Sequence, residues 1–200
     1  MSTTKDRLID VSGDLFYARG FQAVGLDQIL EQVGITKTAF YKHFESKDEL
    51  IIAVLARRDR QELDDWIKWI RIRGSDDARN QLQAFFELLD EWFSKPEFRG
   101  CLFMNALTEF PNENDPINRA ARGHGEHLAA AIQELAAAAG ARQPALLANQ
   151  LMLLITGAIS ARHQAGDLGS ARTASEMARV LIGAQCGSEK TARAVAGKKS

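Results

Sequence analysis

Residues 26–50, LDQILEQVGITKTAFYKHFESKDEL, decide the fold of this chain. An apolar-patterned segment, Leu26–Val33, is followed by Gly34 and then by Thr36, a residue type that caps helix N-termini. A glycine in a short turn between two helices is typical of a helix-turn-helix motif. We therefore expect helices over about 26–33 and 36–43. In such a motif the second helix lies in the DNA major groove.

The second of these helices has an inner side and an outer side. Phe40 and Phe44 are four residues apart, so they share one face, which we expect to pack inward. The residues left outside carry hydroxyl, ammonium, phenol and imidazole groups, which suit phosphates and base edges. They are Thr36, Lys37, Thr38, Tyr41, Lys42 and His43. Lys47 follows at the start of the next helix, where free backbone N–H groups favour a phosphate.

The charge distribution supports DNA binding only locally. The chain has 200 residues, a net charge of -1 and a pI near 6.4. Residues 1–60 contain nine Lys and Arg against nine Asp and Glu, so the basic face is narrow. A surface helix-turn-helix without a nucleic-acid role is the alternative that these residues leave open.

The rest of the chain also has helical periodicity, and no stretch alternates with the period of a β-strand. Only four prolines occur, and the content of apolar residues is 46%. The sequence predicts an all-α protein of about nine helices. Beyond the motif, the expected helices are about 4–19, 46–73, 76–94, 97–109, 115–139, 144–166 and 170–185.

Composition narrows the class of protein further. Two distant cysteines, Cys101 and Cys186, give neither a disulfide framework nor a zinc site, and the N-terminus has no secretory signal pattern. The most apolar run, 151–161, is about half the ~20 residues that a membrane span needs, so we expect a buried helix there. With no nucleophile–base pair, phosphate loop or metal motif, we expect a cytoplasmic non-enzyme without cofactor or metal.

The motif and its flanks resemble the TetR family of transcriptional regulators. The resemblance covers residues 7–55 and is most specific in YKHFESKDEL, residues 41–50, with the upstream Gly20-Phe21 and VGIT at 33–36 in matching spacing. It implies that Tyr41, His43 and Lys47 touch phosphates. It also implies that residues 36–39, including Ala39, lie near bases or flanking phosphates.

Five residues depart from the family pattern. Val24 and Gly25 stand where Thr or Ser is frequent, so a hydroxyl that commonly meets a phosphate is missing. Thr38 replaces a frequent Gly, and Ala39, which can contact a thymine methyl, replaces a polar residue. Leu30 replaces a common Ala. These departures leave the operator sequence open.

The resemblance implies a DNA-binding domain over 1–50 and a helical ligand-binding and dimerisation domain over 51–186. Residues 187–200 contain four Lys or Arg against one acid, which predicts a flexible basic tail. A site for an apolar or aromatic ligand needs apolar walls, although each such residue also suits an ordinary core. The candidate lining residues are Trp66, Trp69, Phe85, Phe86, Leu89, Trp92, Phe103, Met104, Leu107 and Phe110.

A helix that is apolar nearly all round, as 144–166 is, must be covered on several sides. The family resemblance implies that the last two long helices form a dimer interface. The candidate interface residues are Leu147, Leu151, Leu154, Gly157, Ala158 and Ala161. A homodimer would match a palindromic operator, with its two reading helices ~34–36 Å apart or a multiple of that distance.

Two further features are considered for regulation. Cys101 is similar to a cysteine of some electrophile-sensing family members, which makes it a candidate redox-sensing thiol. A buried structural thiol is the alternative, because reactivity requires a lowered pKa. His124 and His127 are three residues apart, yet no third metal ligand can be assigned.

The expected function is therefore a repressor released from its operator by a small-molecule effector. The alternatives are a ligand-independent activator or architectural DNA-binding protein, and a helical enzyme or carrier that keeps the motif as scaffold.

Overall fold

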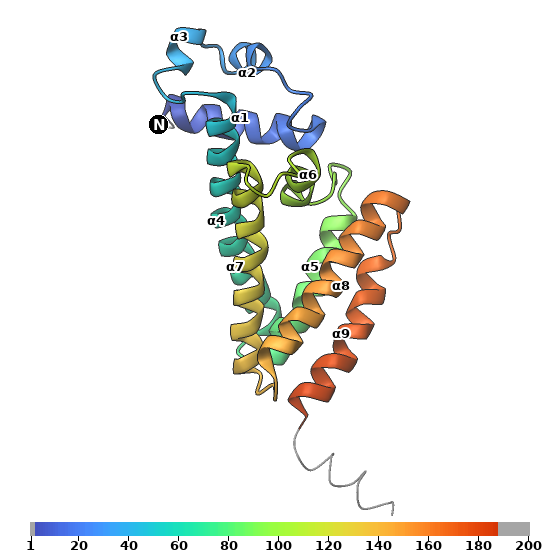
Figure 1. The fold of residues 1–200 in the computed structure, drawn as a ribbon. Helices are drawn as coiled ribbons and strands as arrows, with labels where there is room; N and C mark the ends of the chain where they lie inside the picture. The colour runs from blue at the N-terminus through green and yellow to red at the C-terminus, as the bar shows by residue number, and fades with distance from the viewer. Residues whose placement is uncertain (1–2, 188–200) are drawn as a thin grey trace, which may run out of the picture. The chain divides into compact units, whose positions relative to one another are not determined.

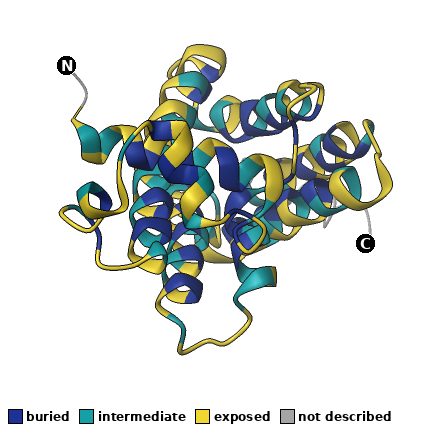
Figure 2. Ribbon diagram, turned by 90° about the horizontal axis from the view of Figure 1, so that it is seen from above, coloured by how far each residue is buried: buried dark blue, intermediate teal, exposed yellow. Residues whose placement is uncertain are grey.

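The computed structural model describes residues 3–187, which are built from α-helices and contain no β-strand (Figure 1). Nine helices occur in this described part of the chain. The all-α class with an N-terminal helix-turn-helix, predicted from the sequence, is confirmed. Most helices bury one face and expose the other (Figure 2). The chain divides into two compact units, and each is described by itself.

The N-terminal unit comprises Met1–Asp65 and Arg99–Glu126. Its helices are α1 (Thr4–Arg19), α2 (Leu26–Val33), α3 (Lys37–Phe40), the first part of α4 (Lys47–Gly74), α6 (Leu102–Glu109) and the first part of α7 (Pro116–Ala138). One hydrophobic core joins these helices, and residues of α6 and α7 belong to it as fully as those of α1. Its most buried members include Leu8, Phe16, Phe21, Ile29, Phe40, Leu50, Ala106 and Ile117.

The second unit comprises Trp66–Phe98 and His127–Ser200. It contains the later parts of α4 and α7 together with α5 (Ala78–Phe93), α8 (Pro144–Ala165) and α9 (Ser170–Cys186). Within it, α9 packs along α5 and α8. Its most buried side chains include Leu82, Phe86, Leu89, Phe93, Leu147, Leu151 and Ala178.

Local sequence explains most helix starts. At α1, Thr3 and Asp6 form a reciprocal capping box, in which each side chain accepts the other's backbone N–H at 3.1 Å. The same type of capping box, with Ser46 and Glu49 in the corresponding positions, forms only by half at α4. Ser46 Oγ accepts the Glu49 N–H, but the Glu49 carboxylate accepts the N–H of Glu45 instead of Ser46.

Two helices are shorter than the sequence predicts. α3 ends at Phe40, because the N–H groups of His43 and Phe44 both donate to the Phe40 carbonyl and close a tight turn. α6 begins at Leu102 instead of about 97, because Gly100 adopts a left-handed φ of +82°. The remaining predicted boundaries lie within about two residues of the observed ones.

α8 is the one described helix that is long and apolar enough to cross a membrane, with a mean hydropathy of 1.5. One third of that apolar window, 33%, is buried inside the chain. The expected domain boundary at residue 50 falls inside α4, and the predicted tail lies outside the described residues except for Gly187.

Candidate nucleic-acid interface

The turn between α2 and α3 has the geometry of a helix-turn-helix. Gly34 ends α2 in the left-handed conformation (φ +74°), and its N–H donates to the carbonyls of Leu30 and Glu31. Thr36 then starts α3 in an extended conformation, with its hydroxyl accepting the Ala39 N–H at 3.2 Å. A residue with a Cβ would be strained at Gly34, so this glycine fixes the angle at which α3 leaves α2.

The inner side of the α3 segment anchors it. Phe40 and Phe44 are 0% and 2% exposed, and their ring centroids lie 5.8 Å apart. The prediction that these two rings pack inward is confirmed. Their burial holds a helix of only four residues, which would not be stable alone.

The outer side carries the predicted DNA-binding residues. Five of them are exposed: Thr36, Lys37, Thr38, Tyr41 and Lys42. Ala39 and His43 are half-buried. The Tyr41 ring is 52% exposed although it is large and apolar, and it leans edge-on against Phe40. The arrangement therefore offers hydroxyl, ammonium and phenol donors on one rigid, solvent-facing segment.

Two cations of α1 that are not among the predicted DNA-binding residues contact the chain just before the turn and just after α3. Arg7 donates through Nη2 to the carbonyl of Val33 at 2.6 Å, just before the turn. Lys5 Nζ lies 5.1 Å from the centroid of the Phe44 ring, just after α3. The basic residues in the first turns of α1 are the sequence signal for this bracing.

Lys47 is placed differently from the other predicted contacts. Its ammonium donates to the Phe21 carbonyl at 2.6 Å and lies 5.9 Å from the Phe16 ring centroid. Burial lowers the pKa of Lys47 below its usual value. Its charge is therefore directed to the loop between α1 and α2, and a contact with DNA phosphate would compete with that bond.

The residues predicted to line a ligand pocket fall in both units. Trp66, Trp69, Phe85, Phe86, Leu89 and Trp92 belong to the second unit, and Phe103, Met104, Leu107 and Phe110 belong to the N-terminal unit. In the N-terminal unit, Phe103 is 2% exposed within the core, and Leu107 and Phe110 pack against that core. These three side chains therefore stabilise the unit that carries the helix-turn-helix.

In the second unit, Phe85 and Phe86 border a small apolar cavity together with residues of α7 and α8. Its volume is about 10 Å³, which is at the lower limit for one water molecule. The other lining residues are Leu82, Ile132, Leu135, Leu151 and Ile155. A ligand of several carbon atoms would enter this site only after the surrounding helices move apart.

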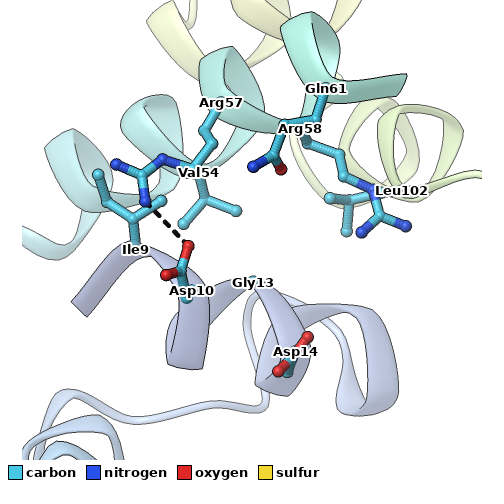
Figure 3. A pocket seen from close by; sticks show the side chains of 9 residues that line it. All are labelled: Ile9, Asp10, Gly13, Asp14, Val54, Arg57, Arg58, Gln61 and Leu102. Carbon is cyan, nitrogen blue, oxygen red and sulfur yellow. Dashed lines mark hydrogen bonds and ion pairs between the residues drawn. The ribbon is translucent and has the colours of Figure 1, made fainter. Parts of the chain in front are cut away.

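A larger cavity of about 120 Å³ lies in the N-terminal unit, bordered by α1, α4 and Leu102 (Figure 3). Both signs of charge line it, and Arg57 is already paired with Asp10 at 2.9 Å and also with Asp6. Because these charges neutralise one another, the lining selects no particular charge in a ligand.

The two candidate regulatory features have structural environments of their own. Burial raises the pKa of the Cys101 thiol to about 11, the opposite of the shift that a reactive thiol needs. His124 is 5% exposed, pairs through Nδ1 with Asp59 at 2.8 Å, and stacks on Phe103 at 3.7 Å between ring centroids. Among residues 3–187 no cluster of three His, Cys, Asp or Glu side chains could hold a metal ion.

α8 has two different apolar faces. Leu147, Leu151 and Ala158 of the predicted dimer interface are 0%, 1% and 5% exposed, because the chain's own core covers them. The opposite face exposes Leu146 and Leu153 at 41% and 74%. Gly157 is also exposed, whereas Leu154 and Ala161 are half-buried.

Two segments of the chain match models of known protein families. Residues 8–54 match the model of bacterial regulatory proteins of the tetR family. Residues 78–182, more than half of the chain, match the tetracyclin repressor-like C-terminal domain.

Curated relatives are transcriptional regulators. The HTH-type transcriptional activator FasR of Mycolicibacterium smegmatis is 33% identical over 92 residues, which span 43% of this chain and 40% of FasR. The HTH-type transcriptional regulator YjdC of Escherichia coli is 25% identical over 154 residues, which span 76% of this chain and 80% of YjdC. The chain thus spans less than half of one relative and most of the other.

Solved structures share the fold over almost the whole chain. SCO4454, a TetR-family transcriptional regulator from Streptomyces coelicolor, aligns with a TM-score of 0.82 at 28% identity, covering 92% of this chain and 96% of that one. The reduced form of E. coli NemR aligns with a TM-score of 0.81 at 19% identity, covering 88% and 95%, which is a likeness of fold.

The first matched segment contains the described helix-turn-helix, and the second contains α5, α8 and most of α9. The chain therefore belongs to the tetR family of bacterial regulatory proteins and is a DNA-binding transcriptional regulator.

Proposed function

We propose that this protein is a homodimeric repressor that binds a palindromic operator and leaves it when a small molecule binds its helical C-terminal part. The observation that carries the proposal is the outer side of α3, where Lys37, Thr38 and Tyr41 are exposed on a segment whose inner side is fully anchored. A rigid segment with several exposed donors loses little conformational entropy when it binds DNA.

The proposed reader consists of Thr36, Lys37, Thr38, Ala39, Tyr41, Lys42 and His43. Residues 36–39 lie at the N-terminal end of α3, the part that approaches base edges in this motif. Tyr41, Lys42 and His43 follow in the turn and would bind flanking phosphates. Lys47 contributes positive charge nearby, although its ammonium is bonded to Phe21.

The proposed dimer interface is the outward face of α8 and α9. On α8 it contains Leu146, Leu153 and Gly157, and on α9 it contains Met177 and Val180, which are 53% and 71% exposed. A Cβ added at Gly157 would meet nothing within 4 Å, so a partner helix could approach closely there. Large apolar side chains left exposed on two packed helices are typical of a face that a second subunit covers.

A second copy explains the apolar outer face of α8 better than lipid does. α9 packs along α8 within the second unit, and both helices expose large apolar side chains. Lipid around α8 would also surround its neighbour α9, which exposes the charged residues Arg172, Glu176 and Arg179, and charged side chains are costly to place in a bilayer.

The proposed effector site is the aromatic-rich region around Phe85 and Phe86. The cavity there is about 10 Å³, so the described conformation is a closed one. An effector that binds an opened conformation shifts the population towards it, and a change from 99:1 to 1:99 needs about 5.5 kcal/mol of differential binding. The effector would be apolar or aromatic, because its walls are apolar.

Relatives regulate in both directions: FasR is named a transcriptional activator, and E. coli NemR, 26% identical over 110 residues, is named a transcriptional repressor. We propose repression, with activation as the alternative. The site of action would be the cytoplasm, on the nucleoid.

A fluorescence-anisotropy titration tests the reader. The wild-type protein is used to select duplexes from a random pool and from DNA flanking its own gene, and binding is measured at two salt concentrations. In the double variant Lys37→Ala/Tyr41→Ala we expect loss of selective binding and a salt slope lower by about 0.9, because the Lys37 ammonium is the one positive charge removed. Lys68→Ala, in the second unit, is the control. Equal binding by wild type and the double variant would refute the assignment.

A further inference from the structure

The loop that leads from α1 into the helix-turn-helix is held by a residue far away in the sequence. One Glu109 oxygen accepts the N–H of Phe21 at 2.9 Å, and the other accepts the N–H of Gln22 at 2.7 Å. Glu109 is the last residue of α6, which lies beside the C-terminal end of α1 in the N-terminal unit (Figure 1). A carboxylate that binds two successive amides fixes their direction as well as their position.

Every group of Phe21 is engaged in this arrangement. Its carbonyl accepts a hydrogen bond from Lys47 Nζ at 2.6 Å. Its ring is 0% exposed and lies 5.1 Å from the Phe16 centroid and 6.0 Å from the Phe110 centroid. Phe21 is therefore held at three points. Glu109 of α6 binds its N–H, Lys47 of α4 binds its carbonyl, and its ring contacts the Phe16 and Phe110 rings.

Glycine at position 20 makes room for the carboxylate. Gly20 has φ +88°, and its N–H donates to the Phe16 carbonyl to close α1. A Cβ at this position would lie 3.0 Å from Glu109 Oε1, tighter than ordinary contact. The left-handed turn also leaves the next two amides pointing away from α1, where Glu109 accepts both.

The two hydrogen bonds to Glu109 also affect the position of α2, the first helix of the helix-turn-helix. Three residues separate Gln22 from Leu26, the first residue of α2, and one of them, Val24, is fully buried. The N-cap of α2 is Gly25, which offers no side-chain hydrogen bond. The start of α2 thus depends for its position on the loop before it, and that loop depends on Glu109.

We propose that Glu109 is a positioning residue for DNA binding: through the Phe21 and Gln22 amides it sets the position of α2, and with it the position of α3 relative to DNA. Glu109 lies outside residues 8–54, which match the DNA-binding family model, and it carries the charge opposite to that of a phosphate contact. The inference rests on the proposed operator binding.

The test compares Glu109→Gln with Glu113→Gln. The two substitutions remove the same charge four residues apart, but Glu113 is 78% exposed and pairs with Arg122 at the surface. Gly20→Ala is a second variant, which displaces the Glu109 carboxylate and leaves the net charge unchanged. Each protein is measured by amide hydrogen exchange without DNA. Each is also measured by anisotropy against a duplex selected by the wild type and against a random duplex.

For Glu109→Gln we expect the Phe21 or Gln22 amide to exchange about tenfold faster, because one acceptor oxygen becomes a donor. We expect the preference for the selected duplex over random DNA to fall about tenfold, equivalent to about 1.4 kcal/mol. The salt slope should stay that of the wild type, because no phosphate contact is lost. Gly20→Ala should change both readouts in the same direction, and Glu113→Gln should change neither.

Faster exchange with an unchanged preference for the selected duplex would overturn the proposal, since the loop would then be held without consequence for DNA. Equal losses in both glutamate variants would also overturn it, because net charge would then be the cause. Failure of the wild type to select any duplex would instead refute the proposed function. The amide exchange still tests whether Glu109 holds the loop in that case.

Discussion

The hydroxyl of Thr36 caps the reading helix, and its removal should weaken operator binding by a calculable amount. Thr36 Oγ1 accepts the Ala39 N–H at 3.2 Å, and α3 is only four residues long. Replacing a Thr N-cap with Ala costs about 1 kcal/mol. Phe40 and Phe44 hold the later part of α3, so the cost falls on its first turn. Where that turn is frayed in free Thr36→Ala and re-forms on DNA, operator affinity is lower by up to about fivefold, because 1.4 kcal/mol corresponds to tenfold.

Three substitutions separate capping from direct contact with DNA. Ser keeps both the cap and the hydroxyl, Asn keeps the cap without the hydroxyl, and Ala keeps neither. Anisotropy titrations against the wild-type-selected duplex should rank Thr36→Ser and Thr36→Asn close to wild type and Thr36→Ala about fivefold weaker. These expected results give Thr36 its place in the reader as the cap of α3. Binding by Thr36→Asn as weak as that of Thr36→Ala would refute the capping argument and assign the hydroxyl to a direct DNA contact.

Three other predictions concern separate parts of the molecule. The double variant Leu153→Glu/Val180→Glu should sediment as a monomer and lose operator binding. The control Glu176→Gln, which lies on α9 with Val180, should stay dimeric, and a dimeric double variant would contradict the interface. Hydrogen bonds from Thr3 and Arg57 lower the Asp6 pKa to about 2, so Asp6 stabilises the fold above the unfolded value of 3.8, and this contribution is lost as the pH falls from about 4 to about 2. Acid-unfolding curves of Asp6→Asn should lack that component, and curves that superimpose on wild type would contradict the assignment. Burial raises the pKa of the Cys101 thiol to about 11, so almost all of it is protonated at pH 7.5; iodoacetamide labelling of its peptide should therefore be slow in the native protein and fast in urea, and rapid native labelling would contradict the raised pKa.

Local signals in the sequence predicted the motif well. Gly34 and Thr36 determine where α2 stops and where α3 starts, because both act through the backbone of their own neighbours. The burial of Phe40 and Phe44 followed from their spacing of four residues. The early end of α3 was not predictable, because the tight turn after Phe40 has no glycine or proline to mark it.

Contacts between distant residues lay outside what local patterns reveal. The bonds of Glu109 to Phe21 and Gln22 join residues 88 and 87 positions apart. Nothing in either local sequence indicates that they meet. The sequence also could not distinguish Lys47 as a phosphate ligand from Lys47 as a partner of the Phe21 carbonyl, since both roles use an ammonium at a helix start.

The outward face of α8 illustrates a different limit. The helix itself is apolar nearly all round, so its periodicity gave no reason to prefer Leu153 over Leu151 as an interface residue. Packing decides between them: Leu151 is 1% exposed in the chain's own core, and Leu153 is 74% exposed.

The most direct test of the central claim is a titration of wild-type protein against its selected duplex and against the same duplex with five base pairs inserted between the half-sites. A symmetric dimer carrying two α3 segments requires its half-sites on one face of the DNA, and five base pairs rotate one of them by about half a turn. We predict two protomers per intact duplex and affinity for the inserted duplex no better than for random DNA. Equal affinity for both duplexes would contradict the account of a dimer reading a palindrome.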